Sequence, residues 1–180
     1  MSKSLGNFYT LRDLLKKGHQ ARAIRYLLLS THYRTQCNFT LQALEAAQQS
    51  VERLLEFTTM LKRVRGKTPV GTNVQPEIKN CITKLQKNFE TAMDDDLNTS
   101  EALAAIFEAV NEIYRIYQNN LLKPADAAAV LTYFEKLDSI LAVLEQKEEI
   151  IPDAVTELAE QRETARKKKD FKTADKLRDE

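Results

Sequence analysis

The sequence contains few of the residues that interrupt helices, and few that bind metals. It has four glycines, four prolines, two cysteines, two histidines and no tryptophan in 180 residues. The scarcity of glycine and proline favours a largely helical chain. Cys37 and Cys81 lie far apart, without a nearby histidine or second cysteine, and this spacing does not fit a zinc site. We therefore predict two ordinary thiols and no metal site.

Long apolar runs are also missing. No stretch approaches the roughly 18 apolar residues of a membrane-spanning helix, and the first residues lack the apolar core of a signal peptide. Hydrophobic residues make up 43% of the chain and charged residues 29%. This composition is typical of a soluble globular protein with one ordinary domain or two small ones. We expect a cytoplasmic protein without a membrane partner.

The charge is nearly balanced overall but unevenly distributed. The formal net charge is only +1. Residues 1–34 carry seven basic side chains against one acidic, a net charge of +6, and residues 162–180 carry eight against five, a net charge of +3. Two basic ends around an acidic middle suit a chain that contacts a polyanion at both ends. A mixed, solvated surface remains the alternative interpretation.

Apolar residues recur at helical spacing along most of the chain, and no segment reads convincingly as a strand. Thr10, with Asp13 three residues later, predicts a short capped helix, and a second helix is expected over residues 20–30. Thr40 predicts the start of a long helix that ends near Gly66. The expected buried face of this long helix is Leu44, Ala47, Val51, Leu54, Leu55, Thr58 and Leu61.

Three more amphipathic helices follow a linker of helix breakers at residues 66–73. Pro76 and Pro124 fit the first turns of two of them, and the strongest apolar periodicity runs from Leu103 to Tyr117 in the third. Short connections make an up-down bundle the simplest architecture, so the predicted fold class is all-α. From residue 147 the apolar period stops and a charged region with little core begins.

Four blocks of sequence carry the functional information. In chain order they are Met1-Ser2-Lys3-Ser4-Leu5-Gly6-Asn7-Phe8, Leu28-Leu29-Ser30-Thr31-His32-Tyr33-Arg34, Ala92-Met93-Asp94-Asp95-Asp96-Leu97-Asn98-Thr99, and Arg166-Lys167-Lys168-Lys169-Asp170-Phe171 with Ala174-Asp175-Lys176-Leu177-Arg178-Asp179. The first resembles the last four positions of the Lys-Met-Ser-Lys-Ser signature of class I aminoacyl-tRNA synthetases, continued as in the cysteinyl branch. Together the blocks resemble the C-terminal portion of a bacterial-type cysteinyl-tRNA synthetase that begins inside the signature.

The resemblance implies three parts. Residues 1–39 would hold the signature loop and stem-contact helices, residues 40–148 the helical bundle named for an Asp-Ala-Leu-Arg (DALR) motif, and residues 149–180 the start of a truncated anticodon-binding module. The tetrapeptide itself does not occur here. The implied parent is an ATP-dependent ligase that activates cysteine and attaches it to tRNA(Cys), with this part binding tRNA.

Lys3 is the catalytic residue that the resemblance implies, because its ammonium would stabilise charge on the pyrophosphate leaving group. Ser2 and Ser4 join it as candidate ATP-binding residues. One lysine cannot position the substrates alone. The His-Ile-Gly-His-type motif and the zinc ligands of the parent's catalytic domain do not occur in the sequence, so ATP and cysteine would bind through that missing domain. The chain by itself is predicted to be inactive in adenylation.

Basic and aromatic residues supply candidate tRNA contacts at two places. Tyr33 and Arg34 follow a predicted helix end, where a cation can cap the free carbonyls or, alternatively, contact an acceptor-stem phosphate beside a stacking tyrosine. Arg166, Lys168 and Lys169 form the best generic phosphate-binding stretch, although acidic neighbours leave a solvated helix as the alternative.

The three consecutive aspartates Asp94, Asp95 and Asp96 invite a metal hypothesis, but helix capping explains them better. They precede Asn98 and a predicted helix start, where carboxylates and a capping residue favour the helix dipole. Magnesium held only by protein carboxylates is an uncommon arrangement. A different functional class also stays open at this point, because the whole chain could be a stand-alone helical protein-interaction module.

Overall fold

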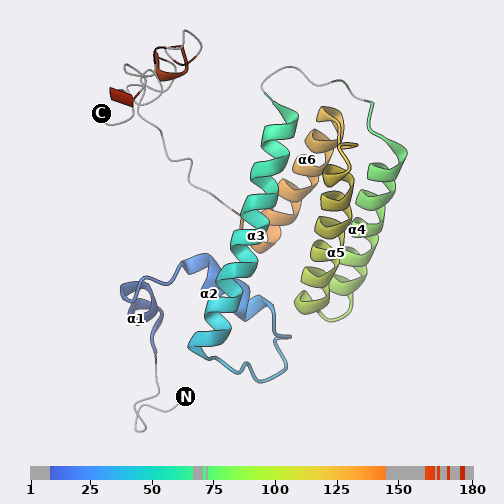
Figure 1. Ribbon diagram of the computed structural model, residues 1–180. Helices are drawn as coiled ribbons and strands as arrows, with labels where there is room; N and C mark the ends of the chain where they lie inside the picture. Colours follow the sequence, from blue (N-terminus) through green and yellow to red (C-terminus); the bar gives the residue numbers. More distant parts are fainter. Residues whose placement is uncertain are drawn as a thin grey trace. The chain divides into compact units, whose positions relative to one another are not determined.

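The computed structural model describes residues 9–66, 71, 73–144, 161–164, 166, 170 and 175–176. The chain divides into two compact units, Met1–Glu145 and Gln146–Glu180. The labelled helices of the first unit are α1 (Leu11–Lys16), α2 (Ala21–Leu29), α3 (Leu41–Arg65), α4 (Pro76–Asp94), α5 (Thr99–Gln118) and α6 (Pro124–Leu141) (Figure 1). The described residues include no strand, and the predicted all-α helical bundle is confirmed. None of the described helices is long and apolar enough to cross a membrane.

The first helix begins after Thr10, the cap that the sequence predicts. The backbone N–H of Asp13 donates to Thr10 Oγ1 at 3.2 Å, and the backbone N–H of Thr10 donates to Asp13 Oδ2 at 2.9 Å. These reciprocal bonds form a capping box and satisfy two N–H groups that the helix leaves unpaired. Gly18 follows the helix with φ +88°, a conformation that glycine adopts without steric cost.

Helix α3 links two parts of the core. Thr40 Oγ1 accepts from the backbone N–H of Ala43 at 3.0 Å at its start, and Gly66 is its C-cap. Its first half closes a small apolar cluster with α1 and α2, and its second half joins the larger core of α4, α5 and α6. The buried residues of the helix are Leu44, Ala47, Val51, Leu54, Phe57, Met60 and Leu61.

The expected buried face of α3 was therefore wrong at Leu55 and Thr58 in its C-terminal half, although Leu61 is buried as expected. Leu55 and Thr58 are only partly buried, whereas Phe57 is completely buried. The physical reason is that α3 contacts α2 at one end and α6 at the other, so its buried stripe turns around the helix axis. A single line of apolar residues, read from the sequence, assumes one partner along the whole length.

Helices α3 to α6 lie side by side in the bundle, with α4 and α5 joined by a short turn (Figure 1). Pro76 and Pro124 occupy the first turns of α4 and α6, as predicted. A buried carboxylate ties these two starts together. Asp126 Oδ1 accepts from the backbone N–H of Gln75 at 2.8 Å, and its Oδ2 accepts from the backbone N–H of Lys123 at 3.0 Å. One side chain thereby satisfies a donor before each helix.

The turn between α4 and α5 holds the three aspartates. Asp94 is the last residue of α4 and Asp95 is its C-cap, while Asp96 and Leu97 both have left-handed φ angles of +53° and +55°. Asn98 caps α5, because its side chain accepts from the backbone N–H of Glu101 at 3.2 Å. The capping interpretation of this block is confirmed for Asn98. Asp96 has a different role, which the next section describes.

Candidate functional site

The candidate site residues divide between described and undescribed parts of the chain. Ser2, Lys3 and Ser4 lie outside the described residues, as do Lys168 and Lys169. Arg166 is described within the second unit and is exposed and helical. Tyr33 and Arg34 lie in the first unit, between α2 and α3, in the segment 32–34 that we call the arm. The contacts described below are therefore those of the arm.

The arm follows the C-terminal end of α2, where two hydroxyl groups donate to backbone carbonyls of the helix. Ser30 Oγ donates to the carbonyl of Leu27 at 2.8 Å, and Thr99 Oγ1, from the start of α5, donates to the carbonyl of Leu29 at 2.6 Å. These two bonds occupy carbonyls that a cationic side chain would otherwise cap. The side chain of Arg34 turns elsewhere, so its interpretation as a helix cap does not fit the structure.

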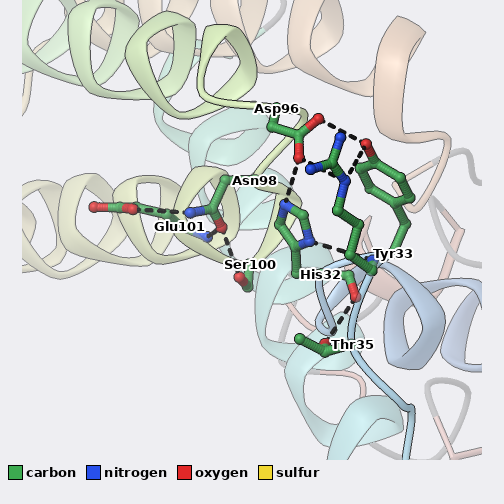
Figure 2. A network of polar contacts seen from close by, with 8 residues as sticks. His32, Tyr33, Thr35, Asp96, Asn98, Ser100 and Glu101 are labelled. Atoms are coloured by element: carbon green, nitrogen blue, oxygen red, sulfur yellow. Dashed lines mark hydrogen bonds and ion pairs between the residues drawn. The ribbon is translucent and has the colours of Figure 1, made fainter.

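The arm side chains converge instead on Asp96 in the α4–α5 turn (Figure 2). Tyr33 OH donates to Asp96 Oδ1 at 2.6 Å, and Arg34 Nε lies 3.0 Å from Asp96 Oδ2. Arg34 Nε is also 3.0 Å from Tyr33 OH, which closes a triangle of three polar groups. His32 Nε2 lies 3.9 Å from Asp96 Oδ2. The arm is thus fastened to a residue far away in the sequence.

Ring contacts add to the order of the arm. The rings of His32 and Tyr33 stack with centroids 4.9 Å apart and planes 24° from parallel, and the Arg34 guanidinium carbon lies 5.5 Å from the Tyr33 ring centre. Thr35 closes the turn by donating its hydroxyl to the carbonyl of His32 at 2.8 Å. Arginine beside an aromatic face is a favourable pairing. Together these contacts fix the planes of two functional groups.

Both functional groups of the arm nevertheless face solvent. Tyr33 is 61% exposed and the Arg34 side chain is 68% exposed. The hydrogen bond that Tyr33 donates to Asp96 raises the pKa of the phenol above its usual value, so the hydroxyl stays protonated. An exposed guanidinium beside an exposed aromatic ring can pair with a phosphate and stack on a base.

Further exposed cations lie on and near α1 and α2. Arg12, Lys16 and Lys17 on and after α1 are exposed, as is Arg25 on α2. Lys17 Nζ lies 4.4 Å from the centre of the Tyr9 ring, and Arg25 donates to the carbonyl of Ala142 at 3.0 Å. The positive charge that the sequence concentrates in its first 34 residues is therefore accessible over their described part, which favours long-range attraction of a polyanion.

Neither cysteine contributes to a site in the described part of the chain. Cys81 is buried in the bundle, and burial raises the pKa of its thiol to about 11. Cys37 is partly buried and also free. Over the described residues, no group of three or more His, Cys, Asp or Glu side chains gathers in a way that could hold a metal ion.

Sequence reasoning identified Tyr33 and Arg34 but missed their anchor. Asp96 lies 62 positions after Arg34, so no local spacing rule connects the two residues. The three aspartates were also equivalent by sequence, and only the left-handed backbone at Asp96 directs one of them to the arm. The single available signal was that two of the four motif blocks contain the arm and the aspartates.

Two known families match parts of the chain. The family described as DALR domain matches residues 88–145, which contain the end of α4, the α4–α5 turn, α5 and α6. The family described as tRNA synthetases class I (C) catalytic domain matches residues 1–49, which contain α1, α2 and the arm. The contact between Arg34 and Asp96 therefore joins residues from both matched regions.

Curated relatives match the chain from end to end. It is 39% identical over 188 residues to the cysteine-tRNA ligase of Chlamydia muridarum and 40% identical over 190 residues to that of Chlamydia trachomatis serovar D, with all of this chain and 39% of each relative covered. The identity to the enzyme of Protochlamydia amoebophila is 41% over 181 residues, covering 99% of this chain and 37% of the relative. The chain thus spans about two fifths of the length of these relatives.

Proposed function

The chain resembles part of the cysteinyl-tRNA synthetases over its whole length, as its motifs predict, and from that premise we propose that it is the tRNA-binding C-terminal part of a cysteine-tRNA ligase. The carrying observation is the arm, where an exposed tyrosine and an exposed arginine are held in one orientation. The match of residues 88–145 to the DALR domain supports the same assignment for the bundle. The intact enzyme would activate cysteine with ATP and attach it to tRNA(Cys) in the cytoplasm.

Arg34 and Tyr33 are the proposed contacts on the acceptor-stem side of the tRNA. Arginine pairs with phosphate through two parallel hydrogen bonds, and phosphate contacts fix the register of a protein on a nucleic acid. Tyrosine stacks on unpaired bases, which is the usual mode of recognition near single-stranded RNA. The basic surface of α1 and α2 would draw the polyanion toward these two groups.

Arg166, Lys168 and Lys169 are the proposed contacts at the other end of the chain. Arg166 is exposed, and it lies in the basic stretch whose phosphate-binding character the sequence predicts. Such a stretch supplies affinity through released counterions, without reading the base sequence. We propose that it belongs to the anticodon side of the tRNA, with the residues that read the anticodon largely elsewhere.

Adenylation chemistry would involve only the first residues of this chain. Lys3 would stabilise negative charge on the pyrophosphate that leaves ATP, and Ser2 and Ser4 would line the same phosphate site. Cysteine selection by zinc would belong to the remainder of the parent's catalytic domain. Because one lysine cannot position the reactants, the purified 180-residue chain should catalyse no exchange of pyrophosphate into ATP. Measurable exchange would contradict this part of the proposal.

The proposed function is tested by titrating the chain with a tRNA(Cys) transcript and with an anticodon-altered copy at two salt concentrations. Salt-sensitive binding that prefers the native anticodon supports a recognition fragment that retains specificity. Equal salt-sensitive binding to both transcripts supports phosphate contacts alone. Absence of binding at low salt contradicts the proposal and favours a helical protein-interaction module.

A further inference from the structure

We propose that Asp96 is a positioning residue for tRNA binding, which holds Tyr33 and Arg34 in the orientation in which they meet the nucleic acid. This role rests on the proposed function. Asp96 itself need not touch the tRNA, because its two carboxylate oxygens are directed at the arm. One oxygen accepts from the Tyr33 hydroxyl and the other pairs with Arg34 Nε (Figure 2).

The closed triangle of contacts is what makes Asp96 an orienting group rather than a simple counter-ion. A single surface ion pair leaves both side chains free to rotate and contributes little. Here the carboxylate binds two side chains that also bind each other, since Arg34 Nε is 3.0 Å from Tyr33 OH. The ring plane and the guanidinium plane are therefore fixed before a ligand arrives. Groups that are ordered in advance lose less entropy on binding.

Arg34 keeps its binding capacity in this arrangement. Within the described part of the chain, its side-chain contacts with Asp96 and Tyr33 both use Nε. The two terminal nitrogens of the guanidinium then remain to donate to a phosphate, in the fork geometry that suits two phosphate oxygens. The exposed fraction of 68% leaves this side of the group open to solvent.

The backbone conformation of the α4–α5 turn places Asp96 beside the arm. Asp96 and Leu97 adopt consecutive left-handed conformations, which non-glycine residues rarely take. The turn is also fastened to the end of α2, where Thr99 Oγ1 donates to the carbonyl of Leu29 at 2.6 Å. Two independent contacts thus connect this turn to the arm and the helix that precedes it. Asp94 and Asp95 make neither contact.

The sign of the effect separates positioning from plain electrostatics. A carboxylate beside a tRNA-binding arginine repels the phosphates, so removal of its charge should tighten binding if Asp96 has no other role. If Asp96 positions the arm, the same removal should weaken binding, because Tyr33 and Arg34 lose their fixed orientation. Asp94→Asn is a matched control, since it removes the same charge two residues away, and among the described residues the arm side chains contact Asp96 rather than Asp94.

The test measures the affinity of the complete 180-residue chain for a tRNA(Cys) transcript at one low salt concentration. We expect Asp96→Asn to weaken binding by roughly 3- to 10-fold, and Asp94→Asn to leave it unchanged or tighten it. In a chain that already carries Tyr33→Ala and Arg34→Ala, Asp96→Asn should weaken binding no further, because the effect acts through these two side chains. Binding by Asp96→Asn as tight as that of Asp94→Asn overturns the positioning role alone. Failure of the unmodified chain to bind overturns the proposed function as well.

An independent readout follows the hydrogen bond itself. The pKa of Tyr33 is raised mainly because its hydroxyl donates to Asp96. In chains with carbon-13-labelled tyrosine, the Tyr33 signal should titrate at lower pH in Asp96→Asn than in Asp94→Asn, with equal thermal unfolding temperatures for the two variants. Loss of affinity without this change in the Tyr33 titration would mean a general structural defect, and would contradict positioning.

Discussion

At the scale of single residues, side chains that meet across the sequence explain more of the site than charge density does. Asp96, Tyr33 and Arg34 form one unit although 62 positions separate the first from the last. The sequence predicted Tyr33 and Arg34 as candidate tRNA contacts because an aromatic residue and a cation directly follow a predicted helix end there. It could not predict Asp96, because long-range pairing leaves no periodic or spacing signal.

Local hydrogen-bond patterns, in contrast, were predictable residue by residue. The capping box of Thr10 and Asp13 and the caps at Thr40 and Asn98 all involve partners three residues apart. Such bonds depend only on residue type and spacing, which the sequence displays directly. The structure confirms each of these caps at the predicted position.

The capping box predicts a pH dependence for α1. Hydrogen bonds from Thr10 lower the pKa of Asp13 below its ordinary value of 3.8. The unfolded segment therefore binds the proton more readily than the folded one, so the capping contribution is fully present above pH 3.8 and is lost as the pH falls through the lower folded pKa. We expect the amide signals of α1 to shift toward unfolded values over that acidic range in NMR spectra. In Asp13→Asn, which does not titrate, the same signals should change much less, and equal acid sensitivity of both chains would refute the role of Asp13.

At the scale of helices, the starts were predictable and the buried faces only partly so. Pro76 and Pro124 correctly predicted the first turns of α4 and α6, since proline fits a position whose N–H needs no helical partner. The buried face of α3 was predicted correctly up to Leu54 and again at Leu61, but incorrectly at Leu55 and Thr58. Which neighbour covers each half of a 25-residue helix is a tertiary fact that the sequence of that helix does not contain.

Asp126 should be a determinant of stability because it serves two helix starts. The side chain is completely buried and accepts from the backbone N–H groups of Gln75 and Lys123. Asp126→Ala leaves both donors without this acceptor, and we expect it to lower the free energy of unfolding by about 2 to 4 kcal/mol, as unsatisfied buried groups do. Urea unfolding measures this loss.

Asp138→Ala is a useful comparison for Asp126→Ala. Asp138 Oδ1 also accepts two backbone N–H groups, those of Val143 and Leu144, but both of these follow the end of one helix, α6. Its replacement should cost less than that of Asp126. A larger loss of unfolding free energy for Asp138→Ala than for Asp126→Ala would contradict the role of Asp126 as the more important determinant of stability.

At the scale of the whole first unit, one aromatic cluster joins α3 to two later helices, α5 and α6. Phe57 of α3 is completely buried, with its ring centre 5.3 Å from that of Tyr114 on α5 and 5.1 Å from that of Phe134 on α6. The sequence predicted a bundle but not this contact. Fold class follows from periodicity and loop length, whereas pairings between faces depend on how the helices cross.

The cluster predicts where the bundle is most sensitive to truncation. Phe57→Ala should lower the free energy of unfolding by about 3 to 5 kcal/mol, because it leaves a cavity between three helices. Phe107→Ala serves as the control, since Phe107 is only partly buried and its described ring neighbours are Tyr26 and Arg53. Urea unfolding of both variants should rank Phe57→Ala as the more damaging, and the reverse order would contradict the central place of Phe57.

The central claim is that this chain binds tRNA with Arg34 on a phosphate, and the salt dependence of binding tests it most directly. The measurement is the slope of log affinity against log salt concentration for the unmodified chain, for Arg34→Ala, and for Lys84→Ala as a control that removes one positive charge from α4. We predict salt-sensitive binding whose slope decreases in magnitude by about 0.7 to 0.9 in Arg34→Ala, the effect of one lost phosphate contact, and stays unchanged in Lys84→Ala. Identical slopes for Arg34→Ala and the unmodified chain, or an affinity that does not depend on salt concentration, would contradict the claim that Arg34 contacts a phosphate.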